Sequence, residues 1–191
     1  LNAITTSLPA LSGTLLDVGC GEMPYRELIL EQSAVTRYIG LDIKNPAYQK
    51  RRQPDLFWEG RTIPLDDHSV DSVIATELFE HLPDLDVVLR EIARVLKPGG
   101  TLVFTVPFLW PLHDSPWDFC RYTPFSLRQH LEANDFDVRD IKALGGWNAS
   151  LAQMIGLWLN RSGLAADDRK RLFAEFAPFY EQLIRSDKVP A

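Results

Sequence analysis

The stretch 15–25 (LLDVGCGEMPY) constrains the fold more than any other part of the chain. A short apolar run ends in Asp17, two glycines follow one residue apart, and Pro24 can open a helix. This order predicts a buried strand, a tight turn and a helix N-terminus. Gly19 and Gly21 lack a Cβ atom, so the backbone can take unusual dihedral angles and a ligand can lie against it. In open α/β sheets, such a turn at the carboxyl end of a strand is where ligands bind.

The residues that follow the second glycine distinguish between two kinds of ligand. A dinucleotide site follows the pattern G-x-G-x-x-G/A, and its phosphates lie over the helix N-terminus. Here Pro24 stands at the position of the third glycine, and Glu22 places a negative charge where the phosphates would lie. A carboxylate there repels a phosphate, whereas it suits S-adenosylmethionine, which carries a sulfonium and an ammonium. For this stretch alone, an ordinary glycine turn without a ligand stays the alternative.

Composition restricts the class of protein. The 191 residues, of which 46 % are hydrophobic and 24 % are charged, are typical of one globular domain. A formal net charge of −6 argues against a nucleic-acid-binding surface. Two cysteines are too few for a disulfide framework, so we expect a cytoplasmic protein. The apolar stretch 149–159 is shorter than the ~20 residues that span a bilayer, so we expect no transmembrane segment.

Apolar runs alternate with amphipathic segments along the chain. Strands are predicted at 14–18, 37–42, 56–58, 70–75, 101–106 and 136–143. Helices are predicted at 24–31, 85–96, 124–132, 148–160 and 167–185. This alternation predicts an α/β fold, with a doubly wound, mostly parallel sheet and helices on both faces. We expect a single domain over 1–191, with a core at 14–143 and a helical C-terminal extension at 144–191.

A second acid, Asp42, lies 21 residues after Gly21, at the end of the predicted strand 37–42. An acid about 20 residues past such a turn is in the position that binds ribose hydroxyls. A carboxylate can accept two hydrogen bonds side by side, which suits a vicinal diol. With Asp17 and the two glycines, this spacing predicts a ligand that contains adenosine; a loop-capping Asp is the alternative.

An ordered set of motifs covers most of the chain and resembles class I S-adenosylmethionine-dependent methyltransferases. The motifs are LDVGCG at 16–21, IGLD at 39–42, IPL at 63–65, VDSV at 70–73, ELFEHL at 77–82 and EIARVLKPGG at 91–100. The resemblance implies a Rossmann-like fold. The segment 113–124 (HDSPWDFCRYTP) is further similar to a bacterial subgroup associated with glycan or polysaccharide pathways. The last antiparallel strand of the family has no counterpart here, so it is either missing or replaced by the C-terminal helices.

The resemblance also implies which residues hold the cofactor, S-adenosylmethionine. Gly19, Cys20 and Gly21 would lie at its methionine end, where Asp17 would organise the turn or receive the amino group. The remaining implied positions are Asp42 at the ribose, Ile43 against the adenine, Glu59 or the Gly60 backbone at the adenine edge, and Thr76 and Glu77 beneath the sulfonium.

The acceptor side is less clearly marked in the sequence. Methyl transfer depends mainly on positioning, which can contribute roughly 7–11 kcal/mol, and a base is needed only if the acceptor holds a proton. His113 is the candidate base, with Asp114 and Asp118 near enough in sequence to orient it; anchoring the loop is its alternative role. The candidate substrate-binding residues, each with a structural alternative, are His81, Trp117, Arg121 and Tyr122.

The sequence therefore predicts an S-adenosylmethionine-dependent methyltransferase that acts on a small-molecule or glycan-like acceptor, on oxygen. The histidines and cysteines show no metal-ligand spacing, so no metal is expected. Two alternatives stay open. One is a catalytically silent protein that binds S-adenosylmethionine, and the other is a nicotinamide-dependent oxidoreductase, which the missing third glycine and Glu22 disfavour. The oligomeric state is left open.

Overall fold

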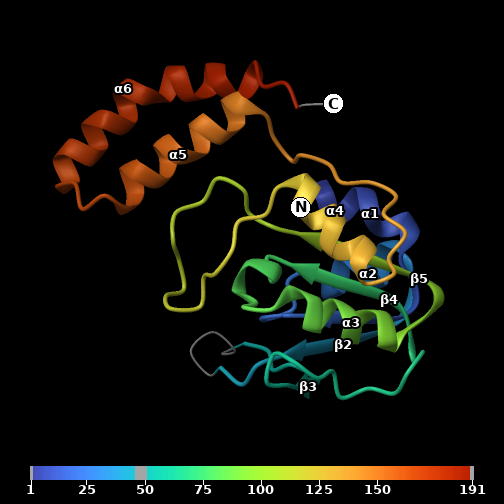
Figure 1. The fold of residues 1–191 in the computed structure, drawn as a ribbon. Coiled ribbons are helices and arrows are strands. Elements are labelled where there is room, and N and C mark those ends of the chain that lie inside the picture. The colour runs from blue at the N-terminus through green and yellow to red at the C-terminus, as the bar shows by residue number, and fades with distance from the viewer. Residues whose placement is uncertain (1, 46–50, 190–191) are drawn as a thin grey trace. The chain divides into compact units, whose positions relative to one another are not determined.

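The computed structural model of the chain describes residues 2–45 and 51–189 (Figure 1). The chain divides into two units by its internal contacts. The first comprises Leu1–Phe108 and Leu112–Arg139, and the second comprises Leu109–Pro111 and Asp140–Ala191. The expected organisation as one domain stays a prediction.

The first unit is built on a five-stranded sheet of order β3-β2-β1-β4-β5, in which every neighbouring pair is parallel. The strands are β1 (Ser12–Val18), β2 (Ala34–Asp42), β3 (Leu56–Phe57), β4 (Val70–Thr76) and β5 (Leu96–Thr105). The second half of β1, from Leu15 to Val18, is buried, as is Ser72–Ala75 of β4. A central parallel strand is covered on both faces, which explains its continuous apolar run. The predicted α/β fold is confirmed.

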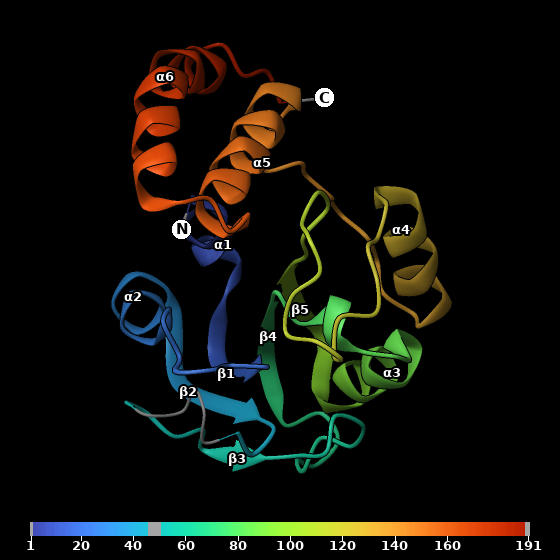
Figure 2. The same cartoon turned by 90° about the vertical axis from the view of Figure 1, so that its left-hand side faces the viewer.

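Helices cover both faces of this sheet. The helices of the first unit are α1 (Asn2–Ser7), α2 (Arg26–Gln32), α3 (Leu85–Val95) and α4 (Pro124–Ala133), with short 3₁₀ turns η1 (Leu8–Ala10) and η2 (Phe79–His81). Figure 2 shows α2 on one side of the sheet and α3 on the other. Leu15 and Ile74 share a core cluster with Ile29 of α2. Because side chains alternate along a strand, their neighbours Leu16 and Val73 face the opposite side.

The helix boundaries follow from local chemistry. The side chain of Asp84 accepts a hydrogen bond from the backbone of Val87 and so caps the start of α3. Thr123 and Ser126 form a reciprocal capping box at the start of α4, and Pro124 occupies its first turn. By contrast, α2 begins at Arg26 and not at the predicted position 24, because the chain is still in a turn with a left-handed φ of 56° at Met23.

The predicted strand at 136–143 is wrong. The backbone N–H of Phe136 donates to Leu131 O at 3.1 Å, which closes the end of α4. Asp135 has a left-handed φ of 64°, so the chain turns there. Residues 136–139 do alternate between half-buried and exposed, yet the described sheet ends at β5. The alternation reflects burial on one side without strand pairing.

The second unit consists of α5 (Trp147–Arg161) and α6 (Ala166–Arg185), close to the two helices predicted there. Trp158 of α5 meets Phe176 of α6 edge-on, with ring centroids 6.1 Å apart. The Asp187 carboxylate accepts hydrogen bonds from the backbone of Gly146 at 2.8 Å and of Ala149 at 3.0 Å, which caps the start of α5. None of the helices in the described parts of the chain has the length and apolar character that crossing a bilayer requires.

Candidate active site

The glycine turn after β1 is held against the end of β2. The backbone N–H groups of Gly19 and Cys20 both donate to Leu41 O, at 2.8 and 3.1 Å. Gly19 has a φ of 73°, and a Cβ atom there would lie 2.8 Å from Leu78 Cδ1. Gly21 has a φ of 51°, and none of the described heavy atoms lies within 4 Å of the place that its Cβ would take. The turn therefore excludes a side chain at its first glycine and leaves open space at its second.

Asp42 joins the end of β2 to this turn. Its Oδ2 accepts a hydrogen bond from the Gly21 backbone at 2.7 Å, and its Oδ1 accepts one from the Ile43 backbone at 2.6 Å. Burial raises the pKa of the Asp42 carboxyl, while these two hydrogen bonds oppose the rise. A carboxylate offers about four lone-pair sites. Two are used by the backbone, so two more can accept hydroxyl groups of a ligand.

Asp17 lies beneath the same turn and is almost completely buried, at 1 % exposed. Its Oδ2 accepts a hydrogen bond from the Tyr38 hydroxyl, whereas its Oδ1 has no hydrogen-bond partner among the described residues. Burial raises the pKa of the carboxyl to about 7, the Tyr38 hydrogen bond lowers it, and the charge of Asp42 raises it further. A buried carboxylate with an open acceptor suits a cationic group.

The other predicted cofactor residues lie around this centre. The Cys20 side chain is buried beside Gly40, where a Cβ would lie 2.9 Å from its Sγ. Its thiol donates to Gly21 O at 3.7 Å. Burial also raises the pKa of the Cys20 thiol, so it stays protonated. Ile43 is exposed beside Asp42. Glu59 and Gly60 lie shortly after β3. Between them and β3 is Trp58, whose backbone N–H donates to Asp42 O at 3.2 Å.

Thr76 and Glu77 lie at the carboxyl end of β4, the strand beside β1. Thr76 pairs with Thr105 of β5, and the Glu77 backbone N–H donates to Thr105 O at 2.9 Å. Glu77 is exposed and has a left-handed φ of 51°. The next residue, Leu78, is the side chain that lies against Gly19. The structure thus brings the ends of β1, β2 and β4 together at one edge of the sheet, as predicted.

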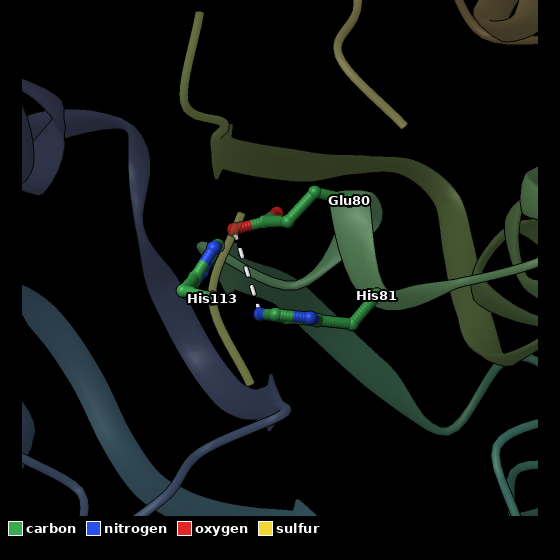
Figure 3. Close-up of side chains that lie close together, drawn as sticks. All are labelled: Glu80, His81 and His113. Carbon is green, nitrogen blue, oxygen red and sulfur yellow. Dashed lines mark ion pairs between the residues drawn. The ribbon is translucent and has the colours of Figure 1, made fainter. Parts of the chain in front are cut away.

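A second cluster lies in η2 and the loop after β5, and it contains Glu80, which the sequence analysis assigned no role. Figure 3 shows the carboxylate of Glu80 and the rings of His81 and His113 converging. Glu80 Oε1 lies 3.7 Å from His81 Nε2, and the ring centroids of His81 and His113 lie 5.0 Å apart. Glu80 is 1 % exposed, and neither carboxylate oxygen has a hydrogen-bond partner among the described residues. Burial raises the pKa of this carboxyl.

Asp118 orients His113. Its Oδ2 lies 3.0 Å from the His113 backbone nitrogen and 3.1 Å from Nδ1 of the ring. Arg121 donates to both carboxylate oxygens, at 2.5 and 2.8 Å. This guanidinium holds the pKa of the Asp118 carboxyl well below its usual range, so the group stays ionised. Of the two acids near His113 in sequence, Asp118 is the one that binds its ring, while Asp114 accepts a backbone hydrogen bond from Trp117.

The remaining predicted substrate residues differ in exposure. Trp117 is 64 % exposed, and its backbone oxygen bonds His81 Nδ1 at 2.7 Å. Tyr122 is buried, and its hydroxyl donates to Phe79 O at 3.4 Å. Burial raises the pKa of that phenol. Arg121 stabilises the loop after β5 through its ion pair with Asp118. The catalytic and substrate roles of these side chains stay predictions, whereas their structural contacts are clear.

Comparisons with known proteins place this chain among methyltransferases. The methyltransferase domain family matches residues 16–104. A probable S-adenosylmethionine-dependent methyltransferase of Mycolicibacterium smegmatis is 30 % identical over 187 residues, covering 89 % of this chain and 68 % of that protein. Malonyl-[acyl-carrier protein] O-methyltransferase 1 of Coxiella burnetii is 29 % identical over 163 residues; they cover 71 % of this chain but only 55 % of that protein.

Among solved structures, an S-adenosylmethionine-dependent methyltransferase from Mesorhizobium loti shares the fold, with a TM-score of 0.60 and 18 % identity. The match covers 73 % of this chain and 81 % of that one. The residues at the sheet edge fit S-adenosylmethionine, the cofactor given in the names of the Mycolicibacterium smegmatis and Mesorhizobium loti proteins. The unpartnered oxygen of Asp17 suits its ammonium, the remaining lone pairs of Asp42 suit its ribose hydroxyls, and no described heavy atom crowds the Gly21 backbone. The chain belongs to the S-adenosylmethionine-dependent methyltransferases.

Proposed function

We propose that this methyltransferase acts on oxygen of a small-molecule or glycan-like acceptor, and that His113 activates that oxygen. S-adenosylmethionine supplies an activated methyl group when bound, so the chain itself must bind and orient the acceptor, and must deprotonate it where the acceptor oxygen is a hydroxyl. The relatives named as O-methyltransferases, of malonyl-[acyl-carrier protein] and of fatty acid, support oxygen as the acceptor atom. The likeness of segment 113–124 to a glycan-associated subgroup supports the acceptor class.

The observation that carries the proposal is the pairing of His113 with a carboxylate that cannot take up its proton. Asp118 is kept ionised by Arg121 and lies at hydrogen-bond distance from His113 Nδ1. The proton of a neutral ring is therefore held on Nδ1, and the lone pair lies on Nε2, where it can accept a proton. The negative charge of Asp118 then stabilises the imidazolium that forms.

The site residues of the cofactor are proposed in the same way. Asp42 would hold the ribose and Asp17 the amino group, with Gly19, Cys20 and Gly21 approaching through their backbone. Ile43, Glu59 and Gly60 would surround the adenine, and Thr76 and Glu77 would close the site from β4. Because the chain belongs to the methyltransferase family, the alternative of a nicotinamide-dependent oxidoreductase is set aside.

A turnover screen separates an active enzyme from a catalytically silent binder. The full chain is incubated with S-adenosylmethionine and panels of sugar hydroxyls and carboxylic acids, and products are scored by mass for the gain of one methyl group. With hydroxyl acceptors we expect His113→Ala to lose about 10²–10⁴-fold in turnover, the usual contribution of a general base, with unchanged binding of S-adenosylhomocysteine. His68→Ala, at an exposed histidine outside the cluster, is the control. Full turnover by His113→Ala would contradict the base role.

A further inference from the structure

We propose that Glu80, His81 and His113 form a binding site for one divalent first-row transition-metal ion, of the zinc or manganese kind. The binding site itself rests on geometry alone. Its role in catalysis, to hold and acidify the acceptor oxygen, rests on the proposed function.

The three side chains are arranged as ligands of a single ion. Each offers one ligand atom, and these atoms all lie within 4.8 Å of one another. Glu80 Oε1 and His81 Nε2 are 3.7 Å apart, too far for a hydrogen bond. Two donors bound at about 2.1 Å to a tetrahedral ion lie about 3.4 Å apart. The observed separation is thus close to what an ion between them requires, and Figure 3 shows the three groups facing one centre.

The burial of Glu80 is an independent indication of a missing partner. Its carboxylate is 1 % exposed, and neither oxygen has a hydrogen bond from any described residue. Buried charges in proteins are paired or coordinate metals, because an isolated carboxylate loses its hydration without compensation. Among the described residues, His81 forms an ion pair with Glu80, and no Arg or Lys does. A cation between Glu80 and the two rings supplies what the protein does not.

The outer contacts of the two histidines match those of metal ligands. His81 Nδ1 bonds the Trp117 backbone oxygen at 2.7 Å, and His113 Nδ1 bonds the Asp118 carboxylate at 3.1 Å. Backbone carbonyls and carboxylates are the usual partners of metal-ligating histidines, and they fix the ring tautomer. Both partners here only accept hydrogen bonds, so Nδ1 carries the proton in each ring. The lone pair of each ring is then on Nε2, the atom that can bind the ion.

The donor set also selects the kind of ion. Two imidazoles and one carboxylate suit zinc, manganese, iron and related ions, whereas magnesium and calcium prefer oxygen ligands. Three protein ligands leave a position that an acceptor can take. There the ion lowers the pKa of an acceptor hydroxyl, whose proton then passes to solvent water. With the ion bound, His113 acts as a ligand; without it, His113 acts as the base described above.

No metal is expected from the sequence because its histidines and cysteines show no ligand spacing along the chain. Glu80 and His81 are adjacent, while His113 lies in another loop 32 residues further on. The pairing of β4 with β5 brings the two segments together, and the backbone N–H groups of Phe119 and Cys120 donate to Glu80 O. No linear spacing rule describes such a set.

Metal binding is tested on the full chain after dialysis against a chelator. Zn²⁺ and Mn²⁺ are titrated by calorimetry with Mg²⁺ for comparison, and Co²⁺ is added as an optical probe of nitrogen ligation. We expect one Zn²⁺ per chain and a higher melting temperature with the ion. His81→Ala and Glu80→Gln should each weaken binding by at least about 10-fold, since even loss of an outer contact costs about 10–100-fold. His68→Ala should bind as the wild type does.

Two results would overturn the site: no binding to the wild type, or wild-type affinity in His81→Ala. His81 is partly exposed, so this variant should fold, and a melting curve without metal verifies that it does. Because the readout is binding alone, failure of the site is separable from failure of the methyl-transfer proposal. Full turnover in the chelated enzyme would support methyl transfer and would contradict a catalytic role for the ion.

Discussion

At the scale of single residues, three carboxylates show how partners decide the state of a buried acid. Asp118 is paired with Arg121, and the pKa of its carboxyl is lowered. Asp17 and Glu80 lack such a partner, each has an oxygen without a hydrogen bond from any described residue, and burial raises the pKa of both. The paired acid orients a side chain. The two unpaired acids mark places where a cationic group of a ligand, or an ion, is accommodated.

Asp17 makes stability depend on pH in a direction that can be worked out. Its carboxyl has a pKa of about 7 in the folded chain against 3.8 in the unfolded chain, so the folded state binds more protons between these values. The free energy of unfolding therefore falls as the pH rises from 4 to 7, by up to about 4 kcal/mol for this group. Asp17→Asn should remove this loss.

Urea unfolding at several pH values measures the difference between wild type and Asp17→Asn. The other titrating groups are common to both proteins, so the difference isolates Asp17. Asp66→Asn, at an exposed acid, serves as the matched control and should follow the wild type. A wild-type-minus-variant difference that does not change between pH 4 and pH 7 would show that Asp17 is not the buried acid described here.

At the scale of elements, the glycine turn between β1 and α2 carries several of the proposed cofactor residues. Gly19→Ala should destabilise the fold for two reasons, the left-handed φ of 73° and a Cβ that would lie 2.8 Å from Leu78 Cδ1. Backbone strain of this kind costs about 1–3 kcal/mol. Gly99→Ala is the control, because its φ of 79° is similar and no described atom lies within 4 Å of its Cβ position. Equal losses in the two variants, measured by urea unfolding, would mean that Leu78 gives way.

The sequence predicted the elements that carry strong local signals. The apolar run before Gly19 and the helical stripe of 85–96 each have a cause within a few positions, and the strand and the helix predicted there are confirmed. The strand at 136–143 failed because alternation reports which side is buried, and pairing needs a neighbouring strand that nothing local specifies.

The candidate site divides in the same way. Asp17, Gly21 and Asp42 were found from spacing, because the carboxyl ends of adjacent parallel strands lie at one edge. Glu80 was given no role from the sequence, since its proposed role depends on its burial and on a loop more than 30 positions away. An acid directly before a histidine in an otherwise apolar segment was the available signal.

At the scale of the whole molecule, all proposed site residues belong to the first unit. The second unit, α5 with α6, is held by its own contacts, among them the Asp187 cap and the Trp158–Phe176 pair. The proposed function therefore depends on the first unit, whose sheet edge is proposed to bind the cofactor through Asp42.

Calorimetric titration of the full chain with S-adenosylhomocysteine tests that claim directly. We expect the wild type to bind one molecule, and Asp42→Ala to bind about 10–150-fold more weakly, the effect of losing hydrogen bonds worth about 1.5–3 kcal/mol to a charged group. Asp66→Asn should bind as the wild type does, and circular dichroism melts should verify that both variants are folded. Absence of heat with the wild type, or unchanged affinity in a folded Asp42→Ala, would contradict the account.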